Sequence, residues 1–409
     1  MSISLPGIGI LLLSDLIVII LFVRSLSIIY KQWDLIPELR LFFTLVCCFI
    51  FSGVILLLLG NITANETFRL IVRDGMVWLI PANILSLSIK EKGILIKALI
   101  LISLFVCIVQ FYFLINPNVS LIAQAYYQFR SQNDPEIAAQ FVFDNQIPRL
   151  YPAGTLLVQM VLGFVLTILF IKVIRIKNSF LKILLILSLI SSTIFTYTLA
   201  GRSNLLAMFV TIILVLVYKY RKQPAKISLS IAATILLIGV TIVLDNAFKL
   251  DVFASIVEKT EMQFAAQGTE YLFYDRRSDN EDAINALVNS PIWGIGKSNT
   301  GIESELGSGQ DVHGVLSLAL QVGFVGLFIF ILISYKMYKR IMTIKQLKSI
   351  KERWALPAIF ALTPAIILLL LNTTPSIIGL RNLLPVGIFI GFILSEFGKM
   401  TKTKTASNA

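Results

Sequence analysis

The sequence is poor in charged residues, cysteine and histidine. Only 14% of its 409 residues are Asp, Glu, Lys or Arg, against about 25% in ordinary soluble domains, so a soluble globular protein is excluded. Its three cysteines, Cys47, Cys48 and Cys107, fall inside apolar runs and are too few for a disulfide framework or a metal site. The motifs GxxxxGK[ST] and HExxH, and GxSxG in an α/β context, are absent, which argues against nucleotide-driven and zinc-hydrolase mechanisms.

The dominant feature is a series of long apolar runs. Hydrophobic residues make up 57% of the chain, in runs of about the length that crosses a hydrocarbon core of ~30 Å. The first run, Leu5–Val23, continues into a basic loop without a small-residue cleavage site, so we predict a spanning helix and not a signal peptide. Hydropathy predicts eleven spans, at about 5–23, 41–60, 70–89, 94–115, 152–171, 183–199, 204–218, 227–244, 312–335, 354–371 and 383–398.

The basic residues occupy alternate connections between these spans. The net charge is +12, and most of the 35 Lys and Arg residues fall in the connections on one side. The positive-inside rule makes that side cytoplasmic, which also places the C-terminus in the cytoplasm and the short N-terminal tail outside. The positive charge therefore reflects membrane topology, and nucleic acid is not an expected partner.

Two connections on the opposite side are long. The whole chain, 1–409, is predicted to form a single transmembrane domain. The first long loop, 116–151, contains an aromatic stretch with Tyr127 and, later, Arg149. It fits an amphipathic helix on the membrane surface. It also fits an aromatic platform for a sugar ring, with Arg149 near the mouth of the site.

The second long loop, 245–311, contains a helix start signal. Residues 278–281, Ser-Asp-Asn-Glu, form a capping box before a predicted amphipathic helix that must end before Pro291. Arg276 and Arg277 directly precede that helix. Their guanidinium groups, together with the free backbone N–H groups of the helix N-terminus, would form a phosphate-binding site. The alternative is a pair of solvated arginines that bind neighbouring aspartates.

Several polar residues near or inside the spans need an explanation. Arg202 lies in a hairpin of a few residues between two spans. It could have a functional role in the site, or its side chain could extend to the lipid headgroups. Arg381, in an outside turn, is a second candidate. Arg73 and Asp74 are predicted to form a mutual ion pair. Asp15 lies in mid-span, where it could be neutral, paired or part of a proton path.

His313 is the only histidine, at the junction of the second long loop and the ninth predicted span. It is followed by Gly314, Gly323 and Gly326, whose spacing permits close helix packing. A single histidine can be purely structural. A neutral imidazole at the membrane surface could also accept a proton from a sugar hydroxyl.

Three of these segments together resemble the O-antigen ligase/polymerase superfamily. They are Gly201-Arg202-Ser203; the stretch from Arg276 through an amphipathic helix to Pro291-x-x-Gly294-x-Gly296; and His313 followed by Gly323-x-x-Gly326. The resemblance covers residues 200–330, and the first half agrees only in hydropathy. The family's aromatic residue after the loop arginine is missing, so Arg276 and Arg277 both remain candidates, and Gly314 stands where the family commonly has Asn.

The resemblance implies an all-α polytopic fold of about eleven transmembrane helices, GT-C-like, with the large periplasmic loop between helices 8 and 9. It implies a metal-independent glycosyltransferase of the bacterial inner membrane, without a cofactor, whose active site faces the periplasm. The donor would be an oligosaccharide linked to undecaprenyl diphosphate. The implied site residues are His313, Arg276 and Arg202 as catalytic groups, with Arg277, Arg149, Arg381 and Tyr127 binding substrate.

The acceptor is left open by these residues. A repeat-unit polymerase would transfer the glycan to the next lipid-linked unit, with a chain-length regulator as a candidate partner, and an O-antigen ligase would transfer it to lipid A–core. A peptidoglycan-type or teichoic-type transferase is a third alternative. A flippase or other transporter should show repeat symmetry and charges near the midplane, whereas most unusual charges here are predicted at one membrane face.

Overall fold

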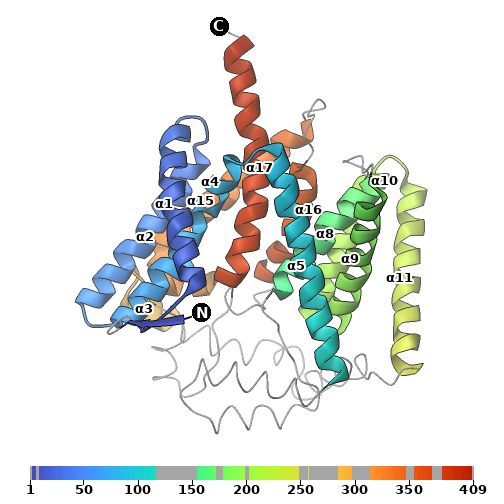
Figure 1. Cartoon of the computed structure of the whole chain (residues 1–409), viewed down its shortest axis with the longest axis horizontal. Coiled ribbons are helices and arrows are strands. Elements are labelled where there is room, and N and C mark those ends of the chain that lie inside the picture. The colour runs from blue at the N-terminus through green and yellow to red at the C-terminus, as the bar shows by residue number, and fades with distance from the viewer. Residues whose placement is uncertain are drawn as a thin grey trace. The chain divides into compact units, whose positions relative to one another are not determined.

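The computed structural model describes residues 2–5, 9–116, 154–171, 178–198, 202–247, 257, 284–296, 314–346, 354–370 and 380–407. Their backbone is almost entirely helical (Figure 1). The chain forms two compact units, unit 1 from Met1–Gly93 with Gln263–Ala409, and unit 2 from Ile94–Met262. The two units are defined by contacts within the chain and do not test the prediction of a single transmembrane domain, 1–409.

Six helices are long and apolar enough to cross a membrane: Leu13–Gln32, Glu38–Leu58, Ile89–Tyr112, Ser179–Thr198, Ser203–Tyr220 and Val315–Met342. Three shorter apolar helices are Thr155–Ile171, Ala355–Leu370 and Leu383–Glu396. These helices are consistent with a polytopic membrane protein, and the count of eleven spans stays a prediction. The three cysteines are free and lie in helices that can span, as the sequence predicted.

The N-terminus differs from the sequence prediction. Strands β1 (Ser2–Leu5) and β2 (Gly9–Leu12) pair antiparallel with Ser2 opposite Leu12, and helix α1 starts only at Leu13 and continues to Gln32. The predicted helix over 5–23 is therefore wrong for its first part. Ser2-Ile3-Ser4-Leu5 alternates polar and apolar residues, which is the period of a strand, and this local pattern outweighs the apolar composition.

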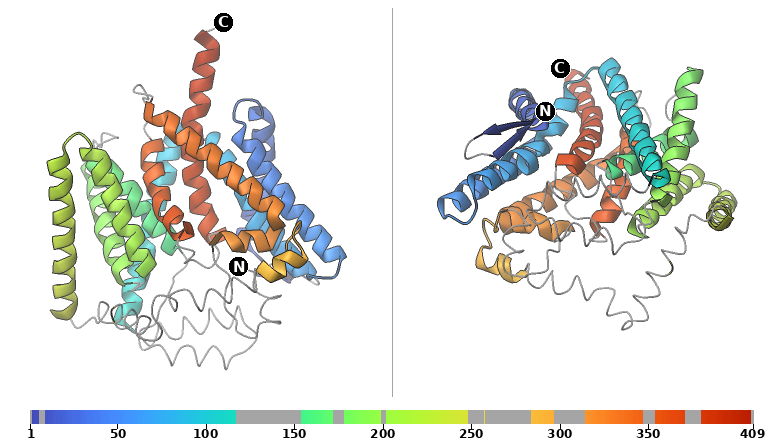
Figure 2. Two further views of the ribbon diagram at one scale, coloured as in Figure 1. Left: turned by 180° about the vertical axis from the view of Figure 1, so that it is seen from behind. Right: turned by 60° about the horizontal axis from the view of Figure 1, so that its bottom comes forward.

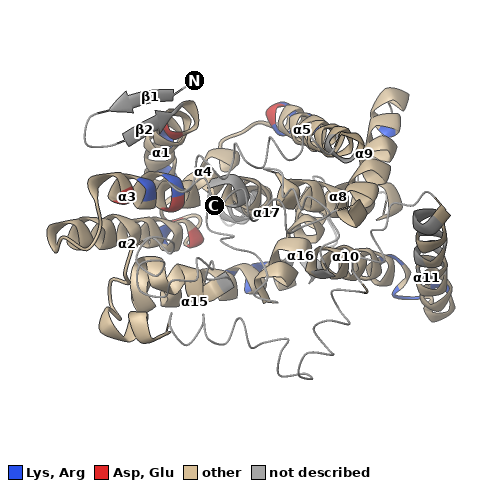
Figure 3. Ribbon diagram, turned by 90° about the horizontal axis from the view of Figure 1, so that it is seen from below, with Lys and Arg blue, Asp and Glu red and all other residues tan. Residues whose placement is uncertain are grey.

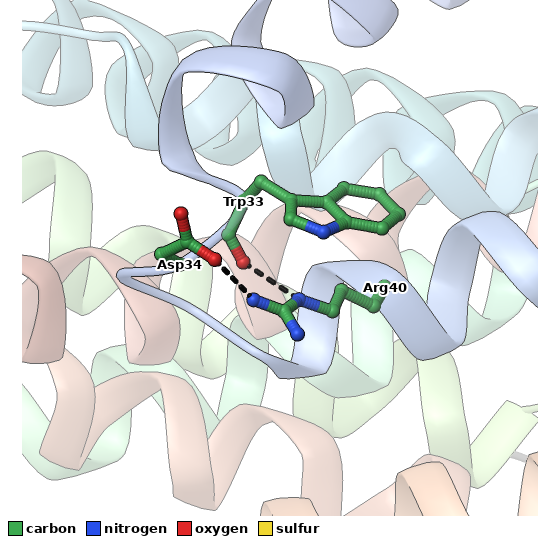
Figure 4. A network of polar contacts seen from close by, with 3 residues as sticks. All are labelled: Trp33, Asp34 and Arg40. Carbon is green, nitrogen blue, oxygen red and sulfur yellow. Dashed lines mark hydrogen bonds and ion pairs between the residues drawn. The ribbon is translucent and has the colours of Figure 1, made fainter.

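The turn from α1 to α2 (Glu38–Leu58) is closed by one arginine (Figure 4). Arg40 donates from Nε to the Trp33 carbonyl at 2.8 Å and from Nη2 to Asp34 Oδ1 at 2.6 Å. Its guanidinium also lies 5.2 Å from the centroid of the Trp33 ring. Because Arg40 and Asp34 are both well exposed to solvent, this ion pair contributes at most about 1 kcal/mol.

The third predicted span, 70–89, falls largely within an irregular helical region, 64–85, that consists of four pieces. They are α3 (Ala64–Phe68), a π-helical stretch η1 (Arg69–Gly75), a 3₁₀ stretch η2 (Met76–Leu79) and α4 (Ile80–Leu85). A capping box between Thr63 and Glu66 starts it. π-helical turns are rare and cost hydrogen-bond geometry, so this one needs a tertiary cause, which the charges of Asp15 and Arg73 supply below.

Unit 1 is built on three helix contacts. Helix α15 (Gly314–Gln346) runs alongside α2, and α17 (Leu380–Ser407) packs on α4 and on α16 (Ala355–Leu370) (Figure 3). Helices α4 and α17 approach closely at Gly391, since a Cβ at that position would lie only 2.5 Å from Ile84 Cβ. Small residues at such contacts let helix backbones approach closely.

Two buried carboxylates link distant segments of unit 1. Glu38, 2% exposed, accepts two hydrogen bonds from Arg340 of α15, at 2.7 Å (Nε–Oε1) and 3.2 Å (Nη2–Oε2). Glu396 accepts a hydrogen bond of 2.8 Å from the Ala355 backbone N–H at the start of α16. The first connects α2 to α15, and the second satisfies a free N–H group of a helix N-terminus.

Unit 2 contains α5 (Ile89–Ile115, from Ile94 on), α8 (Thr155–Ile171), α9 (Ser179–Thr198), α10 (Arg202–Tyr220) and α11 (Pro224–Ala247). Helix α8 is buried on all sides from Leu156 to Ile168. Val106, Cys107, Val158 and Phe195 form a hydrophobic cluster between α5, α8 and α9. Unit 2 is thus organised around one central apolar helix.

Candidate functional site

Five of the seven predicted site residues lie outside the described residues: Arg276, Arg277, His313, Arg149 and Tyr127. The other two have described backbone positions. Arg202 is the first residue of α10, in unit 2, and Arg381 is the second residue of α17, in unit 1. How these side chains meet stays a prediction. What the structure does describe is the framework between the loop motif and the helix that follows His313.

The helix predicted after the capping box exists over 284–289 and ends before Pro291, as its sequence required. Leu287 packs in a buried cluster with Ala319 and Leu320 of α15. The capping box itself, 278–281, lies outside the described residues. The part of the second long loop around Leu287 is therefore anchored on the helix that His313 immediately precedes in sequence.

Helix α15 is broken at the point where the loop reaches it. Val322 (φ −132°, ψ 15°) and Gly323 (φ 70°, ψ −175°) leave the helical region. In an unbroken helix the Phe324 N–H would donate to the Leu320 carbonyl. Instead it donates to the Pro291 carbonyl at 2.8 Å, and the Leu320 carbonyl accepts from the Ile295 N–H at 2.7 Å. The loop thus satisfies the Phe324 N–H and the Leu320 carbonyl, two backbone groups that the break separates.

Glycine is required on both sides of this contact. Gly294 has φ +74°, and a Cβ there would lie 2.4 Å from the Leu320 carbonyl oxygen. Gly323 has φ +70°, and its Cβ would lie 2.0 Å from the Ile292 carbonyl oxygen. Gly296 and Gly326 are also closely surrounded, by Ile62 and Val322. Gly294 and Gly323 therefore permit a direct contact between the loop and helix backbones, whereas Gly296 and Gly326 leave room for side chains.

Helix α2 holds the same joint from the side through Ser52. The Ser52 hydroxyl forms a short hydrogen bond with the Trp293 carbonyl and lies 3.0 Å from the Gln321 carbonyl oxygen. Ser52 is almost completely buried. The sequence analysis missed this residue, whose only signal was a serine within an apolar run, because its partners lie more than two hundred positions away.

Asp15 and Arg73 form a buried ion pair in unit 1. Arg73 donates from Nε to Asp15 Oδ1 at 2.8 Å and from Nη2 to Asp15 Oδ2 at 2.7 Å. The Asp15 side chain has no exposed surface, and that of Arg73 is 20% exposed. Of the alternatives for Asp15, the structure supports pairing. The sequence prediction that paired Arg73 with Asp74 did not anticipate this bidentate contact with α1.

The same contact accounts for the irregular helix around Arg73. A planar guanidinium must align with both carboxylate oxygens to bind bidentately, and the π-helical stretch η1 contains Arg73. A Cβ at Gly75, the last residue of η1, would lie 2.7 Å from Phe49 Cβ of α2. We interpret the π-helical stretch as the backbone path that meets both demands.

Among the described residues no group of three or more His, Cys, Asp and Glu side chains is placed to hold a metal ion. No protein-family model matches the chain, and no curated protein matches its sequence. The functional assignment therefore depends on the residues of this chain and on the framework that arranges them.

Proposed function

We propose that this chain is a glycosyltransferase of the bacterial inner membrane that polymerises oligosaccharide repeat units. It takes the growing glycan from undecaprenyl diphosphate and transfers it to the next lipid-linked unit at the periplasmic face, with the C-terminus in the cytoplasm. The observation that carries this proposal is the joint between the loop segment 284–296 and α15. It joins two motifs of the resemblance, Pro-x-x-Gly-x-Gly and Gly-x-x-Gly, in one rigid backbone contact.

The joint matters because each motif lies close in sequence to groups that the reaction needs. Arg276 and Arg277 stand upstream of the anchored helix 284–289, and His313 stands immediately before α15. Fixing both chain segments to one another limits how far these side chains can separate. Preorganised charged groups stabilise a transition state more effectively than mobile ones.

In the proposed reaction His313 accepts the proton of the acceptor hydroxyl, whose oxygen forms the new glycosidic bond. The bond between the donor's anomeric carbon and the phosphate oxygen breaks. Undecaprenyl diphosphate leaves with the electron pair, and its negative charge is stabilised by Arg202 and by Arg276 or Arg277. Arg149, Arg381 and Tyr127 are assigned to substrate binding. No cofactor or metal takes part in this proposal.

The test is extension of lipid-linked repeat units by the purified protein in vesicles. Losing one charge-stabilising contact typically costs about 3 kcal/mol of barrier, on the order of 10²-fold in rate, so Arg202→Ala and Arg276→Ala should leave single units unextended. Arg24→Ala is the matched control, because Arg24 is exposed and its described partner is Ser86. Normal chain length in both test variants would refute the proposal.

The same assay separates polymerase from ligase. With lipid A–core added as a second acceptor, a polymerase extends the lipid-linked unit and leaves the core uncapped. Transfer to the core alone would assign the protein to ligation and would keep the donor chemistry.

A further inference from the structure

We propose that the segment 284–293 lies in the membrane–water interface, with one apolar stripe in the hydrocarbon of the lipid leaflet. The partner of this surface is the acyl-chain region of the bilayer. The inference concerns where the loop lies and does not depend on the proposed reaction.

The first observation is an exposed apolar stripe along the segment. None of the residues from Ile284 to Gly296 is charged. Large apolar side chains nevertheless stay exposed on the folded chain: Ile284 is 48% exposed, Val288 64%, Ile292 52% and Trp293 38%. Apolar patches that the protein itself does not cover mark contact with a partner or a membrane.

The second observation is that helix 284–289 has three different faces. Leu287 is buried against α15. At about 100° per residue, Ile284 and Val288 lie together about 60° and 100° round from Leu287. Asn285 and Asn289, both exposed, lie about 100° further on. A helix with a protein face, an apolar face and a polar face fits the boundary between protein, lipid and water.

The third observation is the level at which the segment is attached. The Trp293 carbonyl is bound by Ser52, which lies six positions before the last residue of α2, Leu58. Six residues of helix span about 9 Å. Over that distance α2 still exposes Val54, Leu57 and Leu58, as expected of a surface that contacts lipid. The hydrocarbon therefore extends past the point where the loop is attached.

The figures agree with this placement. In Figure 2 the segment 284–296, coloured gold, lies beside the first turns of α15 and near the end of α2 in both views. The segment thus lies beside two helices that are long and apolar enough to span a membrane. Trp293, attached at this level, is of the residue type enriched in the interfacial belt.

The experiment places a nitroxide spin label at Val288 or at the adjacent Asn289 of the full chain. The native cysteines Cys47, Cys48 and Cys107 are first replaced, and each variant is reconstituted in phosphatidylethanolamine–phosphatidylglycerol vesicles. Collision rates are measured with oxygen, which concentrates in hydrocarbon, and with a water-soluble nickel chelate. Both positions are exposed on the folded chain, so neither label should disturb folding. A label at Val54 of α2 gives the lipid reference.

We expect the logarithm of the oxygen-to-nickel collision ratio to be positive at position 288, as at position 54, and negative at position 289. Two results would overturn the inference. Nickel collisions at position 288 equal to those at 289 would place the stripe in water. Protection of position 288 from both reagents would mean that protein, such as a second copy of this chain, covers the stripe.

Discussion

The two compact units differ in whether their described residues bury charged side chains; both bury neutral polar groups. Unit 1 buries charged groups with partners from distant segments, as in Asp15–Arg73 and Glu38–Arg340. Unit 2 buries neutral groups, and the two amide atoms of Gln159 have no hydrogen-bond partner among the described residues. In a membrane-like interior, specific charged partners fix one arrangement, whereas a neutral polar group tolerates several. The charged pairs of unit 1 therefore link segments that are far apart in the sequence.

The largest expected effect comes from breaking the Asp15–Arg73 pair. Arg73→Ala leaves a fully buried carboxylate without its guanidinium, which typically costs about 3–5 kcal/mol. The free energy of unfolding in detergent, measured by titration with denaturant, should fall by this amount. Asp15→Asn/Arg73→Ala should regain part of it, because the buried charge of Asp15 is removed as well. A single variant as stable as the parent would show that the pair adds nothing.

The second effect concerns the joint between loop and α15. Gly323→Ala combines a left-handed backbone position with a Cβ 2.0 Å from a carbonyl oxygen, so we expect a loss of about 3 kcal/mol. The matched control is Gly239→Ala in unit 2, where a Cβ would have no atom within 4 Å and helix propensity predicts a gain of up to about 1 kcal/mol. Equal thermal stability of the two variants would contradict the described joint.

A smaller effect is expected at the other end of α2. Arg340→Lys keeps the charge beside Glu38 but cannot bind both carboxylate oxygens in one plane. We expect a loss of about 1 kcal/mol by the same unfolding titration. Arg340→Met, which removes the charge and leaves Glu38 buried, should cost more. If the lysine variant is the less stable of the two, the carboxylate is not held by charge.

The smallest effect should have the opposite sign. Gln159→Leu in unit 2 replaces two amide atoms, which have no partner in the described part of the chain, by apolar atoms of similar volume. Removing a buried polar group that has no partner should stabilise the protein by about 1 kcal/mol. Gln159→Glu, which adds a charge at the same place, should be strongly destabilising. A destabilised leucine variant would mean that the amide has a partner beyond the described residues.

The sequence predicted the parts of the fold that depend on local pattern. Apolar runs of spanning length indicated the helices, and Pro291 indicated where the loop helix ends. The partners of buried polar groups could not be predicted this way, because Asp15 and Arg73 are 58 positions apart and Ser52 and Trp293 are 241 apart. The motif glycines were recognised, yet only the structure shows that Gly294 makes room for the backbone of α15 and Gly323 for the backbone of the loop.

The break in α15 is conditional on the loop. The Leu320 carbonyl and the Phe324 N–H are the two halves of an ordinary helical hydrogen bond, and each is now occupied by a residue of 284–296. If that segment were deleted, the two groups would be free to bind each other and Gly323 could return to helical angles. The first turns of α15 would then swing into line with the rest. The loop segment therefore bends α15. The direction in which the chain enters α15 at Gly314 then depends on residues 284–296, well upstream in the sequence.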